Sequence, residues 1–511
     1  MSELNPRTKE KDFFGIPGAS ILTIFLPLVV LSLYLCANET YQQEGLTIDI
    51  ETIQSILHQR FVVEWRETFF NFQCWRVYLA WFFGLVFFDL IAPGYWKQGV
   101  ELRDGSKLWY LINGVGLSLG FVGLLVARVW IVGVNTASEG ILTEVVGGVA
   151  GNGTLTDAVN GTLTDSINGT FTEAVNETIA VAGSEGLLEK IAFAVGGTAA
   201  QGFKFEGLPE LDFVYDHFFE LMIITWEFSI LLSNLVYLFS FVPLRGVNGK
   251  GTKERILATG GNSGNIIFDW FIGRELNPRI GKWDIKLFCE LRPGMLLWFV
   301  FNLSCVQRQY QNLGFVHNSL VLVFCLQSFY IFDGVLNEEG LLTMMDITTD
   351  GFGFMLAFGD LTWVPFTYCL QARYLSLVEV ELSNEITCLI GAVMVLGYWI
   401  FKSSNNQKSN FRQGKLPDLK YIQTDRGTRL LIEGWWGLSQ HINYFGDILI
   451  AVSWCLPTGF NTPLTYFYLF YFTSLLLHRQ TRDEAKCRNK YGKHWEEYER
   501  LVPWKIVPYV Y

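Results

Sequence analysis

Charged and aromatic side chains gather near the carboxyl end of this sequence, directly after long apolar segments. Arg479, Asp483 and Cys487 recur every four residues, and Lys490 and Tyr491 follow one turn later. Residues at this spacing share one face of an α-helix. A face of this kind, with further arginines beside it, suits a large anionic cofactor at a membrane surface. A basic helix that meets lipid headgroups is the alternative that the spacing leaves open.

A second basic pair lies earlier in the chain. Lys408 and Arg412 are four residues apart in the stretch NNQKSNFRQGK. Two bases one helical turn apart can clamp a phosphate group. They can equally be ordinary positive charges of a cytosolic loop, and the pair alone does not separate these functions.

Polar groups also interrupt two apolar segments. Gln327, Tyr330, Asp333 and Asn337 fall in or at the end of one segment, and Asp360 lies inside the next. Helical spacing places Tyr330, Asp333 and Asn337 on one side. Ionisable groups inside a membrane are costly and usually face a cavity or a pathway. Hydrogen bonding between helices, worth roughly 1 kcal/mol per pair, is the alternative.

The composition indicates which elements must position these groups. The 511 residues are 50% hydrophobic and only 17% charged, against about 25% charged residues in soluble proteins. Apolar runs long enough to cross roughly 30 Å of hydrocarbon recur along the chain. We therefore predict an all-α, polytopic integral membrane protein with about ten transmembrane helices. The expected spans are 19–37, 77–93, 109–134, 214–243, 293–309, 318–337, 351–372, 386–402, 444–458 and 461–477.

The loop charges predict the orientation of these spans. Clusters of Lys and Arg follow the second, fourth and eighth spans, and such clusters mark the cytosolic side. Both termini are then cytosolic. The expected organisation is a cytosolic segment at 1–18, N-terminal transmembrane helices at 19–259 with a luminal insert at about 135–212, and a C-terminal catalytic region at 260–511.

The luminal insert carries most of the net charge. Residues 135–212 hold eleven acids and two bases, a net of -9 out of the chain's -11. The remainder is nearly neutral, so nothing predicts nucleic-acid binding. An eight-residue repeat in the insert starts each time with an N-x-T sequon, and the first luminal loop has another. The candidate glycosylation sites are Asn38, Asn152, Asn160, Asn168 and Asn176. A neutral low-complexity expansion is the alternative to a decorated loop.

Other classes of site are disfavoured by spacing. Nine cysteines are scattered through the chain without a CxxC pair, and the six histidines show no metal-ligand spacing. We therefore predict buried thiols and no protein-bound metal. No strand–GxGxxG–helix unit is present, which argues against a Rossmann domain.

Three sequence blocks in the second half of the chain carry longer patterns than the spacings described above. The pattern GWWG-x₃-H-x-NY-x-GD occurs at Gly434–Asp447, and HR-x₂-RDE-x₂-C-x₂-KYG-x₂-W-x₂-Y-x₃-VP occurs at His478–Pro503. The third block is GRELNPRIGKWDIKLFCELRPG at Gly273–Gly294. Together these blocks resemble the signatures of a known family, the membrane sterol reductases that use NADPH. The stretch that begins DGVLNEEG looks most like the fungal sterol C-14 reductases. The resemblance is dense from about residue 260 to residue 511.

This resemblance implies a ten-span enzyme of the endoplasmic reticulum membrane that reduces the C14=C15 double bond of a sterol intermediate in ergosterol biosynthesis. NADPH is the implied cofactor, and the sterol enters from the bilayer. The positions implied to contact the cofactor are Lys408, Arg412, Leu431, Trp436, Asn443, Tyr444, Asp483, Cys487, Arg488, Asn489, Lys490, Tyr491 and Tyr498. The positions implied to supply or relay the proton are Tyr330 and Asp483.

The chemistry fits these residue types. An isolated alkene accepts hydride poorly, so C15 is protonated first and the tertiary cation at C14 then takes hydride. This needs an acid that stays protonated near neutral pH, and burial favours the protonated form of a carboxyl. Arg479 would favour the opposite form if it pointed at Asp483. Our hypothesis is that Tyr330 is the proximal proton donor and that Asp483 orients or recharges it.

Three alternatives stand beside this hypothesis. The same scaffold could reduce another sterol double bond, at C7 or C24(28). An isoprenylcysteine-type membrane methyltransferase also has H-x-x-Y before an acidic helix, but the GRELNPR block and the ten-span length argue against it. A nuclear-envelope structural protein would need a long basic N-terminal region, and only about 18 residues precede the first span. The partners expected are the sterol, membrane lipids and other enzymes of the sterol pathway.

Overall fold

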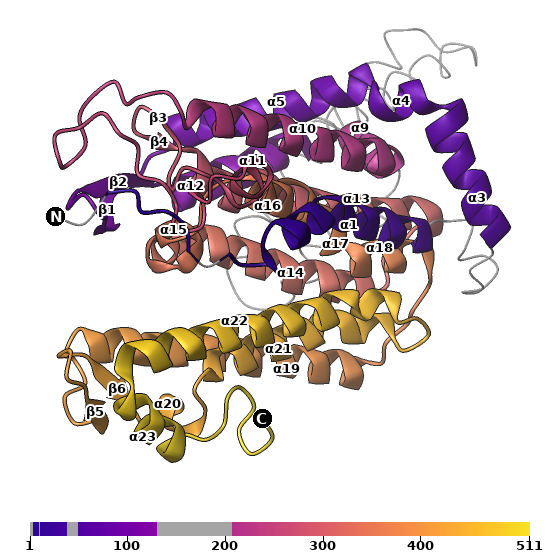
Figure 1. Ribbon diagram of the computed structural model, residues 1–511. Coiled ribbons are helices and arrows are strands. Elements are labelled where there is room, and N and C mark those ends of the chain that lie inside the picture. Colours follow the sequence, from indigo (N-terminus) through magenta and orange to yellow (C-terminus); the bar gives the residue numbers. More distant parts are fainter. Residues whose placement is uncertain (1–3, 10, 38–49, 130–206) are drawn as a thin grey trace, which may run out of the picture. The chain divides into compact units, whose positions relative to one another are not determined.

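The computed structural model describes residues 4–9, 11–37, 50–129 and 207–511, and these are mostly helical (Figure 1). The chain divides into two compact units, Met1–Val115 with Phe213–Tyr511, and Gly116–Asp212. The five candidate glycosylation sites and the eight-residue repeat lie outside the described residues.

Four groups of helices and short strands follow one another along the chain. The first group comprises α1 (Gly15–Cys36), α3 (Ile50–His58), η1 (Gln59–Val63), α4 (Trp65–Phe69), α5 (Phe72–Ile91), β1 (Tyr95–Glu101) and β2 (Lys107–Ile112). The second comprises α9 (Pro209–Asp216), α10 (Phe218–Phe239), α11 (Ile266–Ile272), β3 (Arg279–Ile280), β4 (Trp283–Asp284), α12 (Ile285–Leu291) and α13 (Pro293–Leu313). The third comprises α14 (Asn318–Leu336), η2 (Glu338–Thr343), α15 (Met345–Thr348), α16 (Phe354–Phe358), η3 (Gly359–Trp363), α17 (Val364–Thr367) and α18 (Leu370–Leu377). The last comprises α19 (Asn384–Arg412), β5 (Tyr421–Gln423), β6 (Arg429–Leu431), α20 (Trp435–Leu438), α21 (Ile442–Cys455), η4 (Leu456–Thr458), η5 (Leu464–Tyr466), α22 (Phe467–Tyr491) and α23 (Lys493–Leu501).

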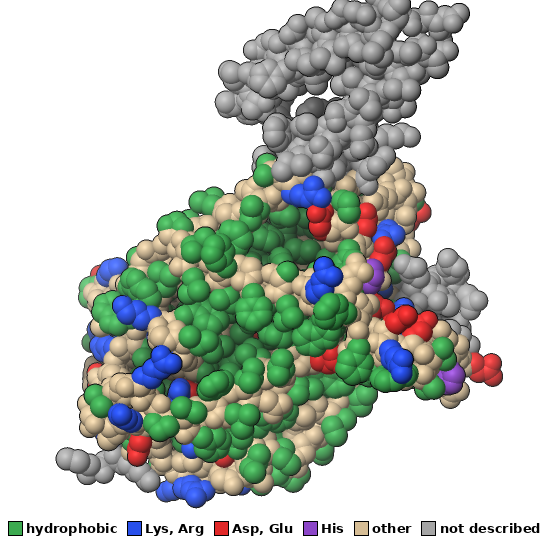
Figure 2. All heavy atoms as spheres, turned by 90° about the horizontal axis from the view of Figure 1, so that it is seen from above, with side chains coloured by type: hydrophobic (Ala, Val, Ile, Leu, Met, Phe, Trp, Pro, Cys, Tyr) green, Lys and Arg blue, Asp and Glu red, His purple; other side chains and the backbone are tan. Residues whose placement is uncertain are grey.

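Five helical segments among the described residues are long and apolar enough to cross a membrane. They are α1, the segment Trp65–Ile91 that comprises α4 and α5, α10, α14 and α19. Large apolar side chains on these helices are exposed, for example Phe83 and Phe87 on α5 and Leu389 on α19. Figure 2 shows a face on which hydrophobic side chains predominate over charged ones. The prediction of a mostly helical membrane protein is confirmed to this extent.

The third expected span, 109–134, is wrong at its start. Residues 95–112 form an antiparallel hairpin of β1 and β2. Gly105 has a φ of 83° at the turn, and the carboxylate of Asp104 accepts the Ser106 N–H at 3.0 Å. Tyr110 and Ile112 point into a buried cluster, so the strand alternates between inside and outside. A helix from Gly114 to Val129 follows.

The seventh expected span, 351–372, is not one continuous helix. It is broken into α16, the π-helical turn η3, α17 and α18. The backbone of η3 lies directly against the start of α13, because a side chain at Gly294 would collide with the carbonyl of Asp360. Pro365 follows one turn later and lacks the N–H that a regular helix would use.

Helices α19 and α21 cross with their backbones almost touching. A Cβ on Gly397 would lie 2.8 Å from the Gly446 carbonyl oxygen, and a Cβ on Gly446 would lie 2.7 Å from the Phe401 nitrogen. Small residues permit such approaches between helices in membranes. This crossing fixes the relative position of the two helices that carry Lys408 and Tyr444.

A buried ionic network joins four other elements. The Arg292 guanidinium is 2% exposed; its Nε donates to Asp89 at 3.1 Å, and its Nη2 donates to Asn113 at 2.8 Å and to Glu338. The indole of Trp283 donates to the other Asp89 oxygen at 2.9 Å. The network fastens the end of the β1–β2 hairpin to α5, α13 and η2.

Candidate functional site

The sequence-predicted cofactor residues come from one group of elements at the carboxyl end, α19, β6, α20, α21, α22 and α23, which lie side by side in Figure 1. Helix α22 ends at Gly492, whose φ is 50°. Arg488 and Lys490 occupy its last turn, where positive charge is favourable because the helix dipole is negative there. The prediction of a helix that carries Arg479, Asp483 and Cys487 on one face is confirmed.

Lys408 and Trp436 meet directly. The Lys408 ammonium lies 3.5 Å from the centre of the Trp436 ring. The buried indole donates its N–H to the Ser404 carbonyl at 2.9 Å. Trp436 also packs with Leu431 in a buried apolar cluster. The structure thus brings together three residues that the resemblance assigned to one ligand.

The residues around Lys408 fit an anionic cofactor. Among the described residues, no carboxylate forms an ion pair with Lys408 or Arg412, and the Arg412 side chain is exposed. The Oδ1 atom of Asn443 is buried and has no hydrogen-bond partner in the described part of the chain. Two bases without an ion pair can bind the negative groups of a ligand, and the amide oxygen can accept a hydrogen bond from an N–H or O–H group of the same ligand.

Asp483 faces a compact set of polar groups. Lys408, His441, Tyr444 and Cys487 all interact electrostatically with it. The rings of His441 and Tyr444 stack at 4.8 Å. Burial lowers the pKa of His441 to about 4, although the carboxylate of Asp483 acts in the opposite direction. The imidazole is therefore neutral at pH 7.

Arg479 does not pair with Asp483. Its guanidinium Nη2 lies 3.1 Å from the Oδ2 atom of Asp346, which belongs to α15. Asp483 itself forms no hydrogen bond or ion pair with any other described residue. The sequence leaves open whether Arg479 holds Asp483 ionised, and the structure places the arginine on a different carboxylate.

Two of the predicted tyrosines and the predicted cysteine pack together in one apolar cluster. Tyr498 is buried with Ile422, and Cys487 and Tyr491 pack against the same cluster. Burial, assisted by Asp483, raises the pKa of the Cys487 thiol to about 11. The thiol is therefore protonated at neutral pH.

Three predicted cofactor residues lie at the outer end of α22. The Arg488 guanidinium contacts Glu484 at 2.9 Å and Glu499 at 3.0 Å. Asn489 and Lys490 are exposed, and the Lys490 ammonium lies 5.0 Å from the Tyr491 ring centre. The charge of Arg488 is thus shared with two carboxylates, whereas Lys408, Arg412 and Lys490 form no ion pair with a carboxylate of the described residues.

The predicted proton donor Tyr330 lies on α14. Its ring packs edge-on against Trp454 of α21 at 4.9 Å. The carboxyl groups that act on it belong to Asp447 and Asp333. Asp333 accepts the Tyr398 hydroxyl at 2.8 Å and pairs with Lys402 at 2.9 Å. Sequence reasoning did not assign Asp447 to the site, although the residue ends the GWWG block.

Gln327, a polar residue on the same helix as Tyr330, forms hydrogen bonds to neighbouring helices. Gln327 accepts hydrogen bonds from the Trp298 indole at 3.0 Å and from Asn302 at 2.7 Å, and it donates to the Tyr368 carbonyl at 3.2 Å. Its hydrogen-bonding role between helices is confirmed. Asn302, which heads a sequon, is fully buried.

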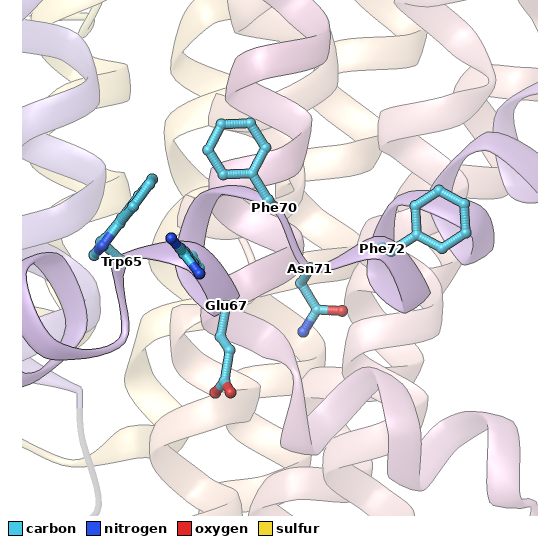
Figure 3. A pocket seen from close by; sticks show the side chains of 6 residues that line it. Trp65, Glu67, Phe70, Asn71 and Phe72 are labelled. Carbon is cyan, nitrogen blue, oxygen red and sulfur yellow. The ribbon is translucent and has the colours of Figure 1, made fainter.

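Two hollows in the described structure do not include any predicted site residue. The larger, of about 660 Å³, is lined by one short segment that joins α4 to α5 (Figure 3). In this view the rings of Trp65, Phe70 and Phe72 point away from the carboxylate of Glu67. The smaller, of about 250 Å³, lies beside the Arg292 network.

Comparisons with known proteins cover the whole chain. The sequence profile of the "Ergosterol biosynthesis ERG4/ERG24 family" matches residues 7–145 and 189–511. The chain is 52% identical to "Delta(14)-sterol reductase ERG24" of Candida albicans over all of this chain and 99% of the relative. It is 49% identical to the protein of the same name in Saccharomyces cerevisiae over the full length of both. It is also 36% identical to "Delta(14)-sterol reductase LBR" of Gallus gallus, over 98% of this chain and 64% of that protein. The chain therefore belongs to the ergosterol biosynthesis ERG4/ERG24 family.

Proposed function

We propose that this protein is an NADPH-dependent delta(14)-sterol reductase of the endoplasmic reticulum membrane. The single observation that carries the proposal is full-length identity of 52% and 49% to two proteins named delta(14)-sterol reductase. The unpaired bases beside Trp436 and the tyrosine inside α14 supply the two chemical functions that this reaction needs. Family membership also removes the methyltransferase alternative.

Lys408, Arg412 and Asn443 would hold the anionic cofactor, with Leu431, Trp436, Tyr444 and Tyr498 as apolar and aromatic walls. When bound, the reduced nicotinamide supplies the hydride that C14 of the sterol receives. Tyr330, which is half-buried with its ring edge-on against Trp454, holds the proton that goes to C15, and C14 then takes the hydride. Asp483 exchanges protons with the cytosol and recharges the donor.

The proposed topology retains ten spans with both termini in the cytosol. The five long apolar helices account for half of them. The helix from Gly114 to Val129, α13, the broken segment from α16 to α18, α21 and α22 stand at the other five expected positions. Positive charge after the second, fourth and eighth spans supports this orientation. The sterol would then enter from the bilayer and the cofactor from the cytosol.

Sterol analysis tests the proposal. Cells that lack their own C-14 reductase should lose their accumulated 14-ene sterols when they express this chain. The purified protein should oxidise NADPH with a 14-ene sterol and not with a 7-ene or a 24(28)-ene sterol. Turnover of the 7-ene in preference to the 14-ene would contradict the assignment.

A further inference from the structure

The position of Arg479 on α22 requires an explanation. It lies four residues before Asp483, the spacing at which a base and an acid on one helix normally pair. Its guanidinium instead lies 3.1 Å from Asp346, a residue 133 positions earlier in the chain. The carboxyl group of Asp483 is left without an ion pair among the described residues.

We propose that Asp346 is a positioning residue that holds Arg479 away from Asp483, so that the Asp483 carboxyl can gain and lose the proton of the reaction. The inference rests on the proposed reductase function and on the role of Asp483 in it. It assigns a purpose to Asp346, which lies in the stretch that begins DGVLNEEG but has no role assigned from the sequence.

A buried lysine forms hydrogen bonds to the backbone of the turn that carries Asp346. Lys286 is fully buried, and its ammonium donates to the carbonyl oxygens of Asp346 at 2.6 Å, Ile347 at 3.1 Å and Asp350 at 2.8 Å. An ammonium has three N–H donors, and all three are used in these contacts. The main chain of residues 346–350 is thus fixed to α12 at three points.

The block Gly273–Gly294, which contains Lys286, also packs against the chain directly after this turn, through Gly273. Gly273 has a φ of 96°, and a Cβ there would lie 2.4 Å from the Gly351 carbonyl carbon and 2.5 Å from the Gly353 nitrogen. A larger residue would push the chain that follows the turn away from α11. The block Gly273–Gly294, which has no assigned part in cofactor binding, therefore builds the support for Asp346.

The surroundings of Asp483 make the position of Arg479 matter. Lys408 from α19, His441 and Tyr444 at the start of α21, and Cys487 one turn further along α22 all interact electrostatically with Asp483. Tyr444 interacts electrostatically with both Arg479 and Asp483, so Arg479 lies within electrostatic range of the residues around Asp483. A released guanidinium would add a second cation beside Lys408 and favour the ionised carboxylate.

The test compares Asp346→Asn with the double variant Asp346→Asn/Arg479→Gln. The single substitution should lower kcat for a 14-ene sterol at pH 7 roughly tenfold, the change that one unit in a group's pKa produces. The alkaline limb of the pH–rate profile should move to lower pH, and NADPH affinity should stay within about threefold. Removal of the released arginine in the double variant should restore most of kcat and the original profile.

Two further variants control for general damage to the helix. Asp12→Asn releases Arg482, which Asp12 holds at 2.9 Å and which lies next to Asp483 in sequence but on another helix face. It should leave kcat and the pH profile unchanged. Asp346→Glu keeps a carboxylate and should show a smaller change in the same direction, which also gives a result if Asp346→Asn does not fold.

A measurement on the cofactor-free protein separates this inference from the proposed activity. Burial, and after it the negative charge of Asp483, raise the pKa of the Cys487 thiol. The released arginine should offset the charge of the Asp483 carboxylate and therefore speed alkylation of Cys487 at pH 8, read by peptide mapping, and the double variant should reverse the effect. Unchanged alkylation and kcat in Asp346→Asn, or no recovery in the double variant, would overturn the inference. A wild-type protein inactive on 14-ene sterols would instead overturn the proposed function.

Discussion

The Lys408 ammonium lies over the face of the Trp436 ring, 3.5 Å from its centre. The indole attracts the cation without neutralising it, since a cation–π contact is worth only about 0.5–2 kcal/mol and adds no negative charge. Lys408 is therefore held without a carboxylate partner among the described residues, in a fixed position that a flexible surface lysine would not have.

Substitution of Lys408 should mainly reduce cofactor affinity. We expect Lys408→Gln to raise the Kd for NADPH at least about tenfold, because a charge-assisted contact is worth roughly 1.5–3 kcal/mol. Isothermal titration calorimetry measures this directly. Lys415→Gln, which alters an exposed lysine seven residues later, is the matched control and should leave Kd unchanged. Equal Kd values in both variants would contradict the role of Lys408.

Loss of the hydroxyl at Tyr330 should remove turnover while cofactor binding remains. General acid groups typically contribute about 10²–10⁴-fold to rate, so Tyr330→Phe should lower kcat by that factor at nearly constant NADPH affinity. Asp483→Asn should also remove turnover while cofactor binding is largely retained. Tyr466→Phe removes another tyrosine hydroxyl without a hydrogen-bond partner in the described structure and should retain activity. Loss of cofactor binding without any intrinsic change in kcat would refute the assignment of Tyr330.

The Arg292 network should dominate the stability of the β1–β2 hairpin region. Arg292→Met leaves the buried carboxylates of Asp89 and Glu338 without their base, which costs about 3–5 kcal/mol. Lys97→Met breaks an exposed pair with Glu339 and should cost no more than about 1 kcal/mol. Thermal unfolding in detergent should show the difference. A similar Tm for both variants would mean that the network is dispensable.

Burial of neutral His441 predicts a loss of stability in acid. The unfolded chain binds a proton with a pKa near 6.5, whereas the folded protein does so only near 4. The contribution is fully present above pH 6.5 and is lost as the pH falls toward 4, by about 2 kcal/mol at pH 5. The wild-type Tm should therefore fall more steeply between pH 7.5 and pH 5 than that of His441→Gln. Parallel curves would show that the imidazole is not buried in its neutral form.

Local pattern was enough to predict the helix that carries Arg479, Asp483 and Cys487, because the four-residue spacing depends only on the helix itself. The partners of these residues could not be predicted in that way. Arg479 pairs with Asp346, which lies 133 positions earlier in the chain, and Lys286 donates hydrogen bonds to three carbonyl groups about 60 positions later. Such contacts depend on how helices from distant parts of the sequence come together.

The two errors in the expected spans have separate physical causes. The apolar run from residue 109 favours a helix by composition, but Asp104-Gly105 before it is a turn signal between two strands, the second of which alternates in burial. This signal is present in the sequence. The break at η3 has no such signal, because the contact of Gly294 with the Asp360 carbonyl becomes visible only after α13 has been placed.

The close crossing of α19 and α21 at Gly397 and Gly446 restricts how ligands can come and go. Helices in backbone contact at such a point resist sliding, since any shift would drive side chains of one into the main chain of the other. The crossing therefore holds the helices that carry Lys408 and Asn443 in a fixed relation to each other. If the proposed cofactor binds between them, we expect its release to require movement of α22 or of the 413–434 segment, not of α19 against α21.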